Sequence, residues 1–403
     1  MVFNKNKVYF YFLFIVIIVF GLFTTETYSL ILTVILVYLY VGSVTESRSN
    51  VHMMFFLGYN SFIFLPALLN WYYLNVDFNL YFLTSFVSVF FLNLTRFTVV
   101  KNFRNYGSQS RIIFVVFSIV MIFFSVLDFS EIVGPLFALV IFLLCLCFKQ
   151  NNFKNNFIYL LIFLLVFFSY VLFTWGGYGR TVVVGWLLLS LLQFSYSIDF
   201  KVNKYLFGLI PGLAAALFSD RDILNLKFSG FESSLADSAY QPYRLASSFI
   251  DEFNANGFDV SGFLDQVLFT VFVFIPRDIW STKPLGFGFE YTVTHYDQQL
   301  IDAGHSIAPT LIGDHIYYLG YLGVISSMVV LLLIAFVTRF LYNIKGFDGN
   351  GVVVFSASMM VLVWGGMTSF SARVALPSII FIVLIALFRR VFTGELKLKV
   401  RTK

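Results

Sequence analysis

Residues Phe157 to Thr174 read FIYLLIFLLVFFSYVLFT, a run of 18 residues without a charged side chain. An α-helix of that length is about 27 Å long, close to the ~30 Å thickness of the hydrocarbon core of a bilayer. A segment that crosses hydrocarbon must satisfy its backbone hydrogen bonds internally, which a helix does. The run therefore predicts a transmembrane α-helix.

The composition extends this expectation to most of the chain. Hydrophobic residues make up 59% of the 403 residues and charged residues only 12%, and the mean hydropathy is +0.87. Soluble domains carry about 25% charged residues, so a soluble fold would leave much of this sequence as exposed apolar surface. Cys145 and Cys147 lie in one apolar run and offer neither a disulfide framework nor a four-ligand metal site.

Apolar runs recur along the chain and predict an all-α polytopic membrane protein with about twelve transmembrane helices. We expect three parts: nine of these helices in 1–218, one large polar loop in 219–312, and three helices with a basic tail in 313–403. The predicted helices lie near 8–23, 29–44, 53–74, 79–95, 112–127, 132–148, 157–174, 181–197, 205–218, 314–338, 351–369 and 374–391.

Charged residues are distributed unequally between the two sides that these helices define. The side that holds both termini has 19 of the 26 Lys and Arg residues, and the other side has 7 of them with 17 of the 21 acidic residues. Because cytoplasmic loops are enriched in Lys and Arg, we expect both termini in the cytoplasm and the loop 219–312 on the outer face. Within that loop, the apolar stretch Val267 to Ile275 is too short to span, so it is expected to lie in the membrane interface or to enter as a re-entrant segment.

The densest polar group in the loop runs from Ile275 to Gly288 and reads IPRDIWSTKPLGFG. Arg277 and Lys283 stand among prolines that stiffen the chain and glycines that permit close approach, a pattern suited to clamping an anion. A basic turn at the lipid headgroups is the alternative. Arg180, after a glycine-rich link, and Arg244 are further outer cations with the same two interpretations.

Several common enzyme motifs are missing from the sequence, including a Walker loop, a dinucleotide fingerprint and a zinc-binding His-Glu-x-x-His helix. An outer-face enzyme without nucleotides must take its driving force from the substrate itself, and a lipid-linked diphosphate provides one. We expect no cofactor, no metal and no nucleic-acid partner. His305 is a candidate general base, with a merely solvated loop histidine as the alternative.

Together, these residues resemble the bacterial oligosaccharide repeat unit polymerases of the Wzy, or O-antigen polymerase, type. The likeness rests on Ile275-Pro276-Arg277 followed by Lys283-Pro284, on the segment Ser306 to Gly323, and on Gly179-Arg180 at the start of a helix. The number of expected helices and the single large outer loop are also similar.

The resemblance implies a glycosyltransferase in the bacterial cytoplasmic (inner) membrane that joins polyprenyl-diphosphate-linked repeat units on the outer face, without a metal, for O-antigen, capsule or exopolysaccharide. A chain-length regulator and a flippase of the same pathway would be its partners. Cations would hold the diphosphate, His305 or secondarily Asp278 would be the base, and loop aromatics would contact sugar rings or pack the loop on the membrane. The diphosphate-binding residues would be Arg180, Arg244, Arg277 and Lys283, and the sugar-binding ones Trp280, Tyr291 and Tyr296.

Two other functions remain open at this point. An O-antigen ligase would use similar arginines to move finished chains onto a lipid acceptor. A flippase of the lipid-linked unit would also have about twelve helices, but it would be expected to line its cavity with intramembrane charges and to lack a long outer loop.

Overall fold

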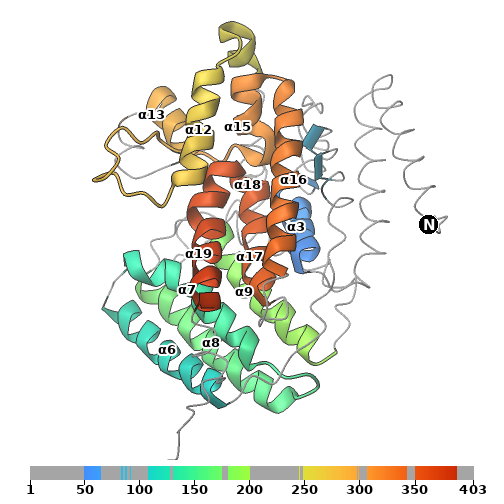
Figure 1. Ribbon diagram of the computed structural model, residues 1–403, viewed down its shortest axis with the longest axis vertical. Helices are drawn as coiled ribbons and strands as arrows, with labels where there is room; N and C mark the ends of the chain where they lie inside the picture. Colours follow the sequence, from blue (N-terminus) through green and yellow to red (C-terminus); the bar gives the residue numbers. More distant parts are fainter. Residues whose placement is uncertain are drawn as a thin grey trace, which may run out of the picture.

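The computed structural model describes residues 50–64, 108–127, 130–174, 180–199, 248–296, 306–342 and 350–387, and single positions between 83 and 91 and at 245 and 298. Every regular element within these ranges is a helix (Figure 1), which confirms the all-α class. Three helices are long and apolar enough to cross a membrane: α8 (Phe153–Phe173), α16 (Leu322–Tyr342) and the run Ser358–Ile380.

The predicted helices at 8–23, 29–44 and 205–218 lie outside the described residues, as do residues 65–74 of the predicted helix at 53–74 and most of the predicted helix at 79–95. The count of twelve helices and their orientation therefore stay predictions. The predicted helices 112–127, 132–148, 157–174 and 181–197 correspond to α6 (Ser108–Val126), α7 (Ser130–Cys147), α8 and α9 (Arg180–Ser197).

The helix α7 forms the centre of the first bundle and packs against α6, α8 and α9. Its side chains are buried from Phe137 to Cys147, as expected for a helix that is apolar on all sides. The Phe137 ring stacks on Trp186 of α9, with centroids 4.8 Å apart. By contrast, α8 exposes Leu165 and Leu172 on its outer side, where lipid would contact them.

The second bundle contains the short helices α3 (Asn50–Tyr59) and α17 (Asn350–Ser356), the helix α18 (Ser358–Phe370), and α19 (Leu376–Leu387). Two π-helical segments, η2 (Asn60–Phe64) and η4 (Ser371–Ala375), extend α3 and join α18 to α19. Both α3 and α9 pack against α18, which connects the two bundles.

The prediction of one continuous helix over 314–338 is wrong. The chain instead forms α15 (Thr310–Leu319), turns at Gly320, and continues as α16, which packs back against α15. Gly320 has a φ of 56°, and a Cβ there would lie 2.4 Å from the Phe253 ring. At Gly323 a Cβ would lie 2.5 Å from the His315 carbonyl oxygen, so this glycine permits the close helix contact. The turn depends on these two glycines. A prediction from hydropathy alone counts them as ordinary residues of a membrane span, so it misses the turn.

A second break interrupts α18 at Gly366, whose φ of 67° is not helical. The break leaves the backbone N–H of Met367 without its helical partner, and the carboxylate of Asp314 on α15 accepts it at 3.0 Å. Asp314 is buried and also accepts the N–H of His315 at 3.0 Å. A carboxylate at the start of a helical segment is favoured by the helix dipole. This contact joins α15 to the second bundle.

The segment predicted as the large polar loop contains the helical residues 248–256, then α12 (Val260–Phe272) and α13 (Phe287–His295). Asp259 caps the start of α12 by accepting the N–H of Gly262 at 2.8 Å. The end of α12 is held to η4, where the Ser371 hydroxyl donates to the Thr270 carbonyl oxygen at 2.5 Å. In Figure 1, α12, α13 and α15 lie together at one end of the molecule, away from α6 to α8.

We predict that Asp314→Ala destabilises the protein, because it leaves the Met367 N–H buried without an acceptor, a loss of about 1–3 kcal/mol. Asp314→Asn retains an oxygen at that position and should lose less. Thermal unfolding of the purified protein in detergent measures both. Equal unfolding temperatures for the wild type and the alanine variant would contradict this role.

Candidate functional site

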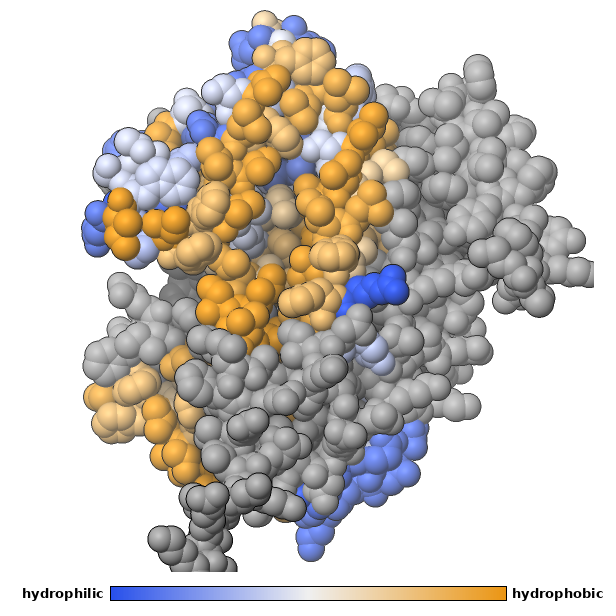
Figure 2. Space-filling model, viewed as in Figure 1, coloured by the Kyte–Doolittle hydropathy of each residue, from blue (hydrophilic) through white to orange (hydrophobic). Residues whose placement is uncertain are grey.

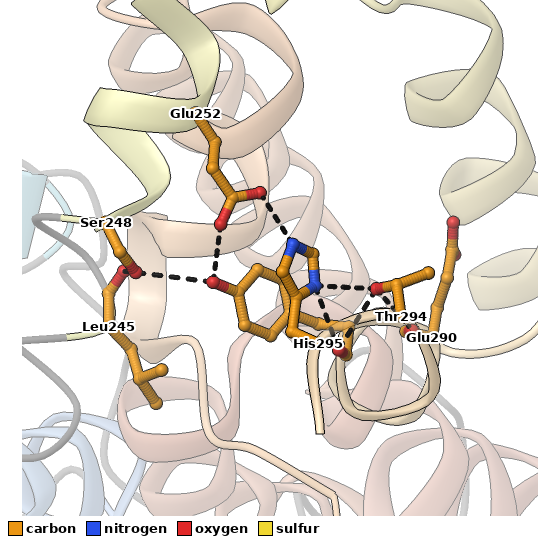
Figure 3. A network of polar contacts seen from close by, with 7 residues as sticks. Leu245, Ser248, Glu252, Glu290, Thr294 and His295 are labelled. Carbon is orange, nitrogen blue, oxygen red and sulfur yellow. Dashed lines mark hydrogen bonds and ion pairs between the residues drawn. The ribbon is translucent and has the colours of Figure 1, made fainter. Parts of the chain in front are cut away.

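A network of polar side chains joins the helical residues 248–256 to α13 (Figure 3). The Tyr291 hydroxyl donates to one carboxylate oxygen of Glu252 at 2.6 Å, and the other oxygen lies 3.1 Å from Nε2 of His295. The hydroxyl of Ser248 is 3.3 Å from that of Tyr291. Side chains of Glu252 and His295 are 23% and 35% exposed, so a molecule from solvent can reach them.

The ring of His295 has a polar neighbour at each of its two nitrogens. Its Nδ1 lies 3.1 Å from the carbonyl oxygen of Tyr291 and 2.7 Å from the Thr294 hydroxyl. That hydroxyl can itself donate to the Glu290 or the Tyr291 carbonyl, each at 3.1 Å, and so accept from Nδ1. With Glu252 at Nε2, both ring nitrogens lie next to groups that can accept a hydrogen bond. Glu252 is the carboxylate of this network, and its two oxygens contact Tyr291 and His295.

Aromatic rings surround the network on the side of the protein interior. The ring of Tyr291 stacks on His295 with centroids 4.0 Å apart and meets Phe249, Phe287 and Tyr317 edge-on or tilted at 5.0 to 5.9 Å. Burial and the bond to Glu252 raise the pKa of Tyr291 well above its ordinary value. These contacts hold the carboxylate in one position, as required for proton transfer.

A second carboxylate, that of Glu290, faces α12 from α13. It accepts from the side-chain amide of Gln266 at 2.5 Å and from the Tyr318 hydroxyl at 3.4 Å. The same amide donates to the Leu285 carbonyl at 3.1 Å. Burial, with a smaller contribution from the nearby Asp265, raises the pKa of Glu290. This group links α12 to α13 and α15.

The turn between α12 and α13 carries the two cations that the sequence analysis singled out. Arg277 donates to the carbonyl oxygens of Lys283 at 2.6 Å and Pro284 at 2.9 Å. Lys283 donates to the carbonyls of Val273 at 2.7 Å and Ile275 at 2.8 Å, at the end of α12. Partial burial and the adjacent Arg277 lower the pKa of Lys283. Lys283 thus caps α12, whereas Arg277 is exposed and retains N–H groups without a hydrogen-bond partner among the described residues.

The remaining predicted site residues have diverse surroundings. Asp278 is exposed on the turn and makes no hydrogen bond or ion pair with a described residue. Trp280 meets the Phe272 ring edge-on at 6.4 Å and donates to Thr282, and Tyr296 is 38% exposed beside Tyr291. Tyr291 presents its hydroxyl to Glu252 while its ring is packed. His305, Arg244 and the side chain of Arg180 lie outside the described residues.

Sequence reasoning did not find Glu252, His295 or Glu290. Glu252 and His295 are 43 positions apart, and no motif spacing connects them. Tyr291 and His295 are four residues apart, an interval that places them on one side of a helix. Their shared partner, the Glu252 carboxylate, could be identified only from the tertiary structure.

Comparisons with protein family models, curated proteins and solved structures gave no match. Within the part of the chain that the structure describes, no three His, Cys, Asp or Glu side chains are grouped so that they could hold a metal ion. The geometry of the network is therefore the basis for assigning a function.

We predict that Glu290→Gln stabilises the protein at neutral and alkaline pH. The folded-state pKa of Glu290 is raised, so its carboxyl group contributes less stability as pH rises from the unfolded value of about 4.3 toward and past the folded value. The gain in unfolding temperature should be larger at pH 8 than at pH 4. An equal gain in unfolding temperature at pH 4 and pH 8 would show that folding does not raise the pKa of Glu290.

Proposed function

We propose that this protein joins polyprenyl-diphosphate-linked oligosaccharide repeat units on the outer face of the bacterial cytoplasmic membrane. The observation that carries this proposal is the Glu252 carboxylate, fixed by Tyr291 and His295, on a segment that also carries the exposed cation Arg277. The substrate of such a reaction has a lipid, a diphosphate and a sugar part. The base would act on a sugar hydroxyl, the cation would bind the diphosphate, and the apolar helices would contact the lipid.

The reaction requires one proton acceptor. The acceptor sugar hydroxyl attacks the anomeric carbon of the donor, a new C–O bond forms, and the bond from that carbon to the phosphate oxygen breaks. The bonding electrons leave with the lipid diphosphate, and the hydroxyl proton passes to a base. Glu252 is the base that we propose, in addition to His305 and Asp278 from the sequence analysis.

The leaving diphosphate is acidic and needs positive charge rather than a proton. Arg277 is suited to this, because its guanidinium is held by two carbonyl oxygens and its remaining N–H groups can bind phosphate oxygens. Lys283 supports the arrangement by capping α12 and maintaining the turn. Tyr296 and Trp280 offer partly exposed rings for sugars.

We predict that Glu252→Gln lowers the rate of polymerisation by about 10²- to 10⁴-fold, the usual contribution of a general base. The assay incubates the reconstituted protein with lipid-linked units extracted from a host that lacks this gene, and follows chain length on a gel. Asp251→Asn, an exposed neighbour on the same helical segment, is the matched control and should retain activity. Full activity in Glu252→Gln would exclude this base.

We predict that Arg277→Ala abolishes polymer in cells while the protein remains in the membrane, and that Arg277→Lys retains part of it. The planar guanidinium of arginine donates several N–H groups to phosphate in a fixed geometry. Lysine carries the same charge on a single ammonium group without that geometry. Gels of surface and lipid-linked glycans report the outcome. Normal polymer in the alanine variant would overturn the diphosphate role.

A strain that lacks the gene distinguishes the alternative functions. Full-length chains stranded on the lipid carrier in that strain would indicate a ligase, and loss of all outer glycan would indicate a flippase.

A further inference from the structure

The segment that joins α18 to α19 carries an arginine among apolar residues. Arg373 lies on the π-helical segment η4, inside the run Ser358–Ile380 that is long and apolar enough to cross a membrane. No other charged residue occurs between Asp348 and Arg389. A charge within an apolar span is costly, and a residue that carries one usually has a function. Short π-helical turns are also frequent at functional sites.

The side chain of Arg373 has no partner within the part of the chain that the structure describes. It is exposed, and it makes no hydrogen bond or ion pair with a described residue. Two positions earlier, Ser371 is buried and donates to the carbonyl oxygen of Thr270 on α12. Residues two positions apart lie on nearly opposite sides of a helix, so the contact that fastens η4 to α12 leaves Arg373 facing away from α12. Its charge is therefore available to a molecule outside the protein.

The outward side that holds Arg373 continues along α19 as an apolar surface. Ile380 and Val383 lie about two and three helical turns further along, and 40% and 39% of their surfaces are exposed. By contrast, Ser378 and Ile382, on the other side of α19, are buried. Figure 2 shows apolar side chains of α16 and α19 on the same side of the molecule. A single cation next to an outward apolar surface is complementary to a membrane lipid, which joins a phosphate to hydrocarbon chains.

We propose that Arg373 binds the phosphate group of a membrane lipid, and that Ile380 and Val383 contact the hydrocarbon chain of the same molecule. The planar guanidinium offers several N–H groups to phosphate oxygens. Anionic phospholipids and polyprenyl diphosphates both supply this chemistry. The site is formed by η4 and α19 alone, so it does not depend on the proposed function. An arginine that only extends toward the headgroups, without retaining one lipid, is the competing interpretation.

The test measures lipid binding to the purified full-length protein by native mass spectrometry. Undecaprenyl diphosphate, phosphatidylglycerol and diacylglycerol, which has no phosphate, are titrated separately, and the dissociation constant of the first bound lipid is determined for each. Arg373→Ala and Arg373→Gln are compared with the wild type. Arg339→Ala is the matched control, because Arg339 is an exposed arginine in the last turn of α16. A phosphate lipid with a photoreactive group in its chain identifies the residues that the chain contacts.

We expect both variants of Arg373 to bind a phosphate lipid about 10- to 100-fold more weakly than the wild type, the usual effect of removing a charge-assisted hydrogen bond. Binding of diacylglycerol should not change, and the photoreactive lipid should label α19. An effect on undecaprenyl diphosphate alone would identify that carrier as the ligand, and an effect on phosphatidylglycerol as well would identify a general headgroup site.

Three results would overturn the inference. The first is an equal dissociation constant for each phosphate lipid in the wild type and in both variants of Arg373. The second is the same loss of binding in Arg339→Ala, which would show that any exposed arginine of a span has this effect. The third is photolabelling confined to helices other than α19.

Discussion

The hydrogen bond from the Met367 N–H to the Asp314 carboxylate is the interaction on which the packing of α15 and α12 depends. In hydrocarbon a helix cannot leave a backbone N–H without an acceptor, so the break at Gly366 is possible only because α15 supplies one. The same glycine allows the Thr310 carbonyl and Pro309 to approach the backbone of α18 closely. The break and its partner therefore position α15, and α15 in turn positions α12, against which it packs.

From this anchor, α12, α13 and α15 pack with polar groups between them. Gln266 on α12 reaches Glu290 on α13, and Tyr318 on α15 reaches the same carboxylate. The apolar side chains of α12, such as Leu264 and Val271, remain exposed on its other side. Placing the polar groups together thus leaves the apolar ones facing outward.

The candidate site draws on this arrangement. Glu252 is held by Tyr291 and His295 of α13, and Arg277 is held by the backbone of the turn between α12 and α13. Neither charged group relies on a partner of opposite charge alone, because hydroxyl or backbone groups fix each in position. Such preorganisation suits a reaction in which a proton is removed at one place and negative charge develops at another.

The sequence by itself determined the all-helical class and the helices α6, α7, α8 and α9, because long uncharged runs have few alternatives to a buried or lipid-facing helix. It also indicated the Arg277 to Lys283 turn and an apolar stretch too short to span. The tertiary structure decided where the predicted helix at 314–338 breaks, since a glycine's positive φ depends on what packs against it. It alone brought Glu252 to His295, because contacts between distant segments are set by packing and not by local pattern.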